Sequence, residues 1–110
     1  MSIHDDREIS VLIHLAAEFI AREAGRSTLI TPTRAELSPD GKRAIVYVSV
    51  FPDTETAHAL EFLSRNDDAF RSYMKKHARL AHLPRVAFQE DRGEKHRQRL
   101  DELSRDADSR

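Results

Sequence analysis

Apolar side chains recur at regular intervals near the start of the chain. One stripe has the three- and four-residue spacing of an α-helix that is buried along one side. Its members are Ile9, Leu12, Ile13, Ala16, Phe19 and Ile20. Asp5 and Glu8 have the spacing of a capping box, and Gly25 suits the position that follows a helix C-terminus. The pattern therefore predicts an amphipathic helix over residues 5–24.

The next two segments alternate with the two-residue period of β-strands. In residues 43–51, small and β-branched side chains occupy every second position. These are Ala44, Val46, Val48 and Val50. A Ser-Pro-Asp-Gly turn sequence at 38–41 separates this segment from residues 29–37, which predicts an antiparallel hairpin. Pro32 has no backbone N–H, so we expect it near a strand end or with its nitrogen facing away from the neighbouring strand.

The second half of the chain predicts two short helices and a third strand. Residues 54–64 carry four apolar side chains for a buried side, namely Ala57, Leu60, Phe62 and Leu63. Three N-cap residue types then interrupt the pattern at Asn66, Asp67 and Asp68. A second helix is expected over about 68–80, with an apolar stripe of Phe70, Tyr73, Met74, His77 and Ala81. Pro84 ends it, and residues 85–90 have a strand pattern.

The predicted order α-β-β-α-α-β indicates one α+β domain in two layers over residues 1–91. Strands two and three are joined by two helices, which is long enough for a crossover to a parallel neighbour. We therefore expect a three-stranded mixed sheet with the helices on one face and the other face open. Residues 92–110 are polar and charged, and we expect a frayed helix or a disordered tail there.

Basic residues are concentrated in one part of the chain, although the formal net charge is only −1. Residues 71–99 hold nine Lys and Arg against three Asp and Glu, while the rest of the chain is acidic. A basic block of this kind indicates a polyanion partner, or alternatively a basic helix face that is simply solvated.

No motif of catalysis or metal binding is present. The chain has no cysteine, no glycine-rich phosphate loop and no HExxH or GxSxG sequence. His77 lies on an apolar stripe, so we expect a partly buried packing role and not metal ligation. We therefore expect a binding protein, not an enzyme, with no metal and no cofactor. The acidic first 25 residues do not resemble a signal peptide, and no apolar run is long enough for a bilayer, so we expect no membrane contact and a cytoplasmic location.

Three segments resemble the ribosome-binding factor A family, which has a type II KH-like fold. The first is Thr31–Phe51, the second Phe70-Arg71-Ser72, and the third Leu80–Phe88, which contains a Pro-x-x-x-Phe strand. Asp91 matches the aspartate that follows the family's last strand. The similarity covers about Ile9 to Asp91.

The resemblance implies a monomeric assembly factor that binds the free small (30S) ribosomal subunit and its rRNA during late maturation and rRNA processing. The family has a helix–kink–helix with an Ala-x-Gly motif where this chain has Asn66, Asp67 and Asp68. Two carboxylates there would repel a phosphate. Either the RNA contacts lie further along the helix, or the affinity for RNA is reduced.

Six basic residues are the candidates for RNA binding: Arg71, Lys75, Lys76, Arg79, Arg85 and Arg92. Three of them follow at intervals of four along one predicted helix, so their charges can track a phosphate backbone. Aromatic residues that could stack on bases are few, and Tyr47, Phe51 and Tyr73 are all candidates for the core, which favours recognition of RNA backbone and shape over base readout. The alternative is a protein-interaction module with complementary acidic and basic faces and no RNA role.

Overall fold

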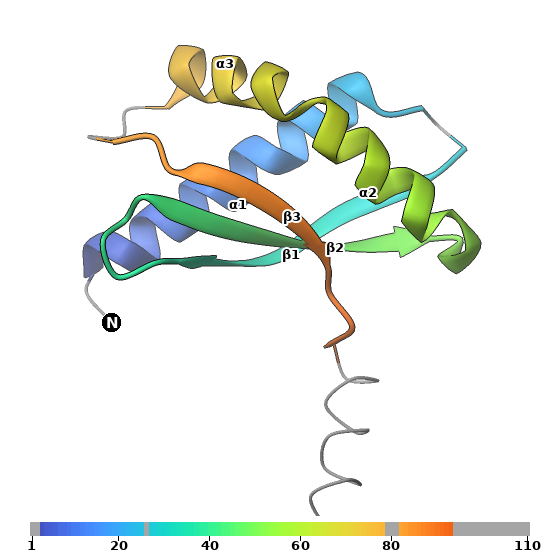
Figure 1. The fold of residues 1–110 in the computed structure, drawn as a ribbon, viewed down its shortest axis with the longest axis horizontal. Coiled ribbons are helices and arrows are strands. Elements are labelled where there is room, and N and C mark those ends of the chain that lie inside the picture. The colour runs from blue at the N-terminus through green and yellow to red at the C-terminus, as the bar shows by residue number, and fades with distance from the viewer. Residues whose placement is uncertain (1–2, 26, 79–81, 94–110) are drawn as a thin grey trace, which may run out of the picture.

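The computed structural model describes residues 3–25, 27–78 and 82–93, and its elements follow the predicted order (Figure 1). The helices are α1 (Ile3–Glu23), α2 (Thr56–Arg65) and α3 (Asp67–His77), with a short 3₁₀ turn η1 (Asp53–Glu55) before α2. The strands are β1 (Leu29–Leu37), β2 (Arg43–Phe51) and β3 (Arg85–Glu90). Arg79 and residues 94–110 lie outside the described residues, so the expected tail stays a prediction.

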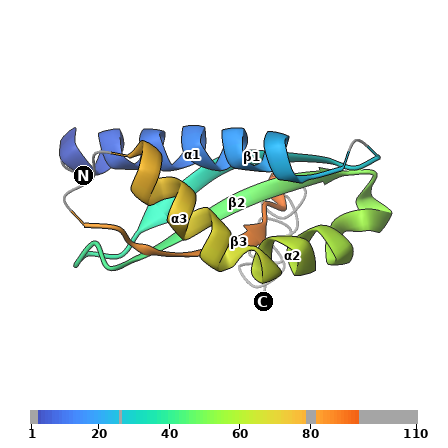
Figure 2. The same ribbon diagram turned by 90° about the horizontal axis from the view of Figure 1, so that it is seen from above.

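The three strands form one mixed sheet in the order β1-β2-β3. β1 pairs with β2 antiparallel, and β3 pairs with the other edge of β2 in parallel. All three helices lie on one side of this sheet, with α1 along β1 and with α2 and α3 along β3 (Figure 2). The expected α+β fold in two layers, with a three-stranded mixed sheet, is therefore confirmed.

The core lies between the helices and one face of the sheet. The alternating small residues of β2 are all buried there: Ala44, Val46, Val48 and Val50. The apolar stripe of α1 covers them, with Leu12, Ala16 and Phe19 almost fully buried. Three rings join α1, α3 and β3, because the ring centroid of Phe70 is 5.2 Å from that of Phe19 and 5.5 Å from that of Phe88. The helical and strand periods thus place the apolar side chains of both layers in one core.

Two details of the helices differ from the sequence prediction. Ala57 is exposed, and Ala59 is buried in its place, because Ala59 lies four residues before the buried Leu63 and therefore on the same side of α2. His77 is exposed rather than partly buried, since α3 ends at this residue and Ala78 is already extended. The His77 ring still lies 4.3 Å from the ring of Tyr73, centroid to centroid.

Pro32 is the fourth of the nine residues of β1, away from both ends of the strand. β1 is an edge strand, and its register with β2 shifts between Pro32 and Arg34. An edge strand tolerates a missing N–H because only one side of it is paired.

The turn between β1 and β2 fixes the position at which β2 begins. The hydroxyl of Ser38 and the backbone N–H of Lys42 both donate to the Asp40 carboxylate, at 2.6 and 3.0 Å. These two bonds hold the pKa of Asp40 below its usual value. Gly41 has φ +71°, which glycine adopts without strain. Ser38 also accepts the backbone N–H of Arg43 at 3.0 Å, so the first residue of β2 is held in place.

Candidate nucleic-acid interface

A single residue, Asn66, separates α2 from α3 (Figure 1). The side-chain amide of Asn66 donates to the backbone carbonyl of Phe62 at 2.8 Å, while the backbone carbonyl of Asn66 accepts the N–H of Phe70 at 2.9 Å. The Asn66 side chain therefore closes the end of α2 and makes no capping bond to α3. Asp67 and Asp68 occupy the first turn of α3, where negative charge interacts favourably with the helix dipole.

The basic residues of α3 do not all lie on one side of the helix. Arg71 and Lys75 follow Asp67 at intervals of four, so these three lie along one side of α3. Asp67 borders two pockets that β3 also lines, which identifies this side as the one toward β3. Lys76 is rotated by about 100° from Lys75, onto a different side of the helix. The structure thus separates Lys76 from the pair Arg71 and Lys75, and all three are exposed.

The side of α3 toward α1 is occupied by an intramolecular network. The hydroxyl of Tyr73 donates to Oε2 of Glu18 at 2.9 Å, and the guanidinium of Arg22 lies 5.4 Å from the Tyr73 ring centroid. Nε2 of His14 lies 2.8 Å from Oε1 of Glu18. Burial and the bond to Glu18 raise the pKa of Tyr73. These groups fasten α3 to α1 and leave the side toward β3 as the free basic surface.

A small pocket of about 180 Å³ lies between β3 and the junction of α2 with α3. Its lining is mainly apolar, with Leu60, Leu63, Val86, Ala87 and Phe88 beside Ser64 and Asp67. Asp67 therefore places a carboxylate at the edge of this groove. A phosphate that approached the groove at this point would meet an exposed negative charge.

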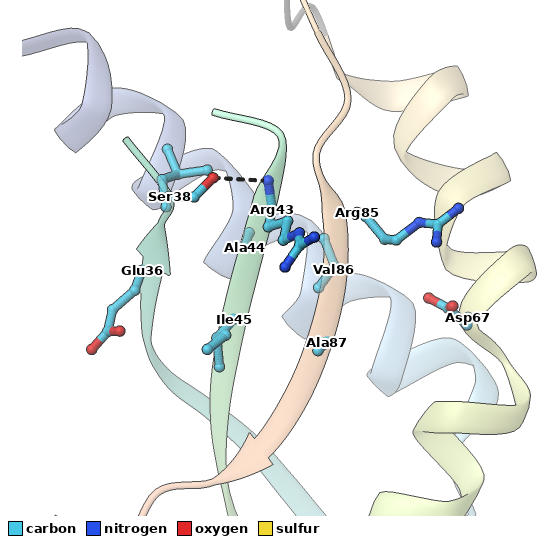
Figure 3. A pocket seen from close by; sticks show the side chains of 10 residues that line it. Glu36, Ser38, Arg43, Ala44, Ile45, Asp67, Arg85, Val86 and Ala87 are labelled. Atoms are coloured by element: carbon cyan, nitrogen blue, oxygen red, sulfur yellow. Dashed lines mark hydrogen bonds between the residues drawn. The ribbon is translucent and has the colours of Figure 1, made fainter. Parts of the chain in front are cut away.

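A larger hollow of about 590 Å³ lies over the first residues of β2 and β3 (Figure 3). Arg85 borders it, and its side chain extends from β3 toward α3 and Asp67. Arg43 borders it as well, because the parallel register pairs Arg43 directly with Arg85. Arg43 was not among the residues predicted from the sequence. No local pattern identifies it, since its neighbour is 42 residues away and depends on how β2 and β3 pair.

Arg92 lies apart from the other candidates. It follows β3, whose six residues span roughly 20 Å from the start at Arg85. Its Nε is 3.5 Å from Oε1 of Glu90, so its charge is partly satisfied within the chain. Arg79 lies outside the described residues. Of the predicted residues, Arg71 and Lys75 thus share one side of α3, and Arg85 extends from β3 toward the start of that helix.

Two kinds of feature are absent from the described residues. No three His, Asp or Glu side chains among residues 3–25, 27–78 and 82–93 are grouped so that they could hold a metal ion. Within the same residues, no helix combines the length and the apolar character needed to cross a bilayer.

Several known proteins are similar to this chain. The family model for ribosome-binding factor A matches residues 6–104. Ribosome-binding factor A of Thermotoga petrophila is 33% identical over 89 residues, which are 80% of this chain and 68% of that protein. The corresponding protein of Kosmotoga olearia is 39% identical over 67 residues, which are 60% of this chain and 54% of that protein.

Solved structures show the same fold. The solution NMR structure of a putative ribosome-binding factor A from Thermotoga maritima superposes with a TM-score of 0.71 at 29% identity, over 84% of this chain and 92% of that one. The crystal structure of ribosome-binding factor A from Thermus thermophilus gives 0.68 at 32% identity, over 81% and 98%. A homology model of the T. thermophilus factor, fitted into the cryo-EM map of its 30S complex, gives 0.66 at 31% identity, over 76% and 90%. With a family match over nearly all of its length, the chain belongs to the ribosome-binding factor A family.

Proposed function

We propose that this protein binds the free small (30S) ribosomal subunit through its rRNA and assists late maturation and rRNA processing. Membership of the family supports this proposal, as does the T. thermophilus relative that was fitted into the map of a 30S complex. In this proposal the protein acts as a monomer in the cytoplasm. It is a binding protein and not an enzyme, and it uses no cofactor.

One observation of the structure carries the proposal. Arg71 and Lys75 are exposed on the side of α3 toward β3, and neither forms an ion pair with a carboxylate of the described residues. Cations that are not neutralised within the chain are available to phosphates, and they are displaced by salt. Their position further along α3 than Asp67 fits an RNA backbone that approaches beyond the carboxylate.

Co-sedimentation of the purified protein with free small subunits, large subunits and assembled ribosomes, across a series of salt concentrations, tests the proposal. We expect selective binding to free small subunits that weakens as salt increases. Absence of binding to every particle at low salt would contradict it. Binding to the small subunit that does not change with salt would also contradict it, because contacts to phosphates weaken as salt increases.

Neutralising the carboxylates at the start of α3 is expected to strengthen RNA binding. In Asp67→Asn with Asp68→Asn, the repulsion of an approaching phosphate is removed, which we expect to increase the affinity for small subunits roughly three- to tenfold at about 0.1 M salt. The same change removes two favourable interactions with the helix dipole, so the free energy of unfolding should fall by about 0.5–2 kcal/mol.

The matched control for that variant is Asp6→Asn with Asp53→Asn, which removes two exposed carboxylates from α1 and η1. Both double variants change the net charge equally. If both raise the affinity by the same factor, the change in net charge explains the effect. Asp67 and Asp68 then do not lie closer to the bound phosphates than other carboxylates do.

A further inference from the structure

The hollow over the first residues of β2 and β3 lies mainly on the open face of the sheet, and Asp67 at the start of α3 borders it. β2 directs Ile45 toward it and β3 directs Ala87, and the register places these two side by side as an apolar floor. Arg43 and Arg85 form the next pair along the same two strands (Figure 3). The hollow therefore combines a small apolar surface with two guanidinium groups at one end of it.

The backbones that carry the two arginines are held by hydrogen bonds. The N–H of Arg85 donates to the carbonyl of Lys42 at 2.8 Å, and the N–H of Arg43 donates to the Ser38 hydroxyl at 3.0 Å. The two Cα atoms are thus neighbours in a fixed ladder. Like charges at directly paired positions of a sheet repel each other, and an anion bound by both relieves this repulsion.

The carboxylates near the hollow do not form ion pairs with its two arginines. Glu36 accepts a hydrogen bond from Arg34 at 2.8 Å, and Asp40 accepts bonds from the turn. Asp67 borders the hollow but makes no ion pair with Arg85 in the described part of the chain. Both arginines are therefore exposed and free to bind an external anion.

A guanidinium group stacked on an aromatic ring lies on the same face of the sheet. Tyr47 is the next residue of β2 on this face, and the guanidinium carbon of Arg34 lies 3.8 Å from its ring centroid. Arginine planes and aromatic rings are surfaces on which unpaired bases stack. The bases of a duplex are already stacked inside the helix, so only a single strand can place a base here.

We propose that this hollow binds one nucleotide of a single-stranded RNA. Arg43 and Arg85 contact the phosphates on either side of that nucleotide, and its base lies on the floor formed by Ile45 and Ala87. The inference rests on the proposed function, and it adds a second RNA contact, on the sheet beside the start of α3. An acidic protein segment is the competing occupant, and the octaglutamate arm of the test below distinguishes it from RNA.

NMR titration of the isotope-labelled full chain with an unstructured octauridylate tests the hollow directly. We expect the methyl signals of Ile45 and Ala87 and the Nε–H signals of Arg43 and Arg85 to shift, and an RNA duplex of similar length to leave the two methyl signals unchanged. Unchanged Ile45 and Ala87 methyl signals with octauridylate would overturn the inference. Equal shifts of these methyl signals with an octaglutamate peptide would overturn it as well.

A variant that keeps both positive charges distinguishes specific contacts of the two guanidinium groups from nonspecific attraction between positive charge and RNA. Arg43→Lys with Arg85→Lys keeps both charges and removes the two planar forks, so we expect the affinity for octauridylate to fall at least about fivefold. Arg7→Lys with Arg65→Lys, at exposed positions of α1 and α2, should leave it unchanged. An affinity that is the same in both variants would contradict the inference.

The two proposals can fail separately. If the wild-type chain binds small subunits but octauridylate does not shift the Ile45 and Ala87 signals, only the inference about the hollow is wrong. If the chain binds no ribosomal particle but the signals shift, the hollow binds single-stranded RNA and the proposed function is wrong.

Discussion

Replacing Arg71 and Lys75 by glutamate is expected to weaken binding to the free small subunit by about 30-fold at roughly 0.1 M salt. A unit charge about 4 Å from a phosphate contributes about 1 kcal/mol in water, and each substitution turns one such attraction into a repulsion. The unscreened total is about 4 kcal/mol, and we take roughly half of it to remain in salt, which leaves about 2 kcal/mol. Co-sedimentation with small subunits measures the change.

The neutral variants Arg71→Gln and Lys75→Gln make this test more specific. Together they should reduce the slope of log K against log salt by about 2, since two phosphate contacts are lost. Arg7→Glu with Arg65→Glu reverses the same number of charges elsewhere and serves as the control. A slope equal to that of the wild type would place the rRNA contacts on another part of the molecule.

Replacing Phe70 by alanine is expected to lower the free energy of unfolding by about 3–5 kcal/mol. The side chain is 1% exposed, and its ring contacts the rings of Phe19 on α1 and Phe88 on β3. Its removal leaves a cavity at the point where both layers meet. A domain of this size has a total of only about 5–15 kcal/mol, so a large part of the stability depends on this residue.

Urea unfolding followed by circular dichroism measures this loss. Phe51→Ala is the matched control, because Phe51 is 72% exposed and its truncation should change the free energy of unfolding by less than about 1 kcal/mol. Where Phe70→Ala is too unstable to purify, Phe70→Leu should still cost about 1–2 kcal/mol. A loss below about 1 kcal/mol for Phe70→Ala would show that the three rings are not the centre of the core.

Much of the fold could be predicted from the spacing of apolar residues and turn residues in the sequence. The helix over α1 and the hairpin were predicted because periods of 3.6 and 2 appear directly in Leu12, Ala16 and Phe19 and in the valines of β2. The turn was predicted from Pro39, Asp40 and Gly41, whose backbone preferences act locally. The end of α3 at His77 was placed three residues too late, since Leu80 and Ala81 continue the apolar pattern while the backbone becomes extended at Ala78.

The candidate site could be predicted from the sequence only in part. The intervals between Arg71 and Lys75 lie within one helix, so the sequence alone indicated their common side. Lys76 was grouped with them because it is adjacent in the sequence, whereas a rotation of about 100° per residue turns it away. Arg92 was grouped by its charge, although the length of β3 separates it from Arg85.

The sequence by itself determined the elements, their order and the basic side of α3, since these depend on residues within a few positions of each other. Only the tertiary structure decided that Arg43 lies beside Arg85 and that Asp67 borders the grooves next to β3. The parallel register of β2 and β3 is the reason. It is set by how α2 and α3 pack over the sheet between them, and such packing depends on contacts between residues far apart in the chain.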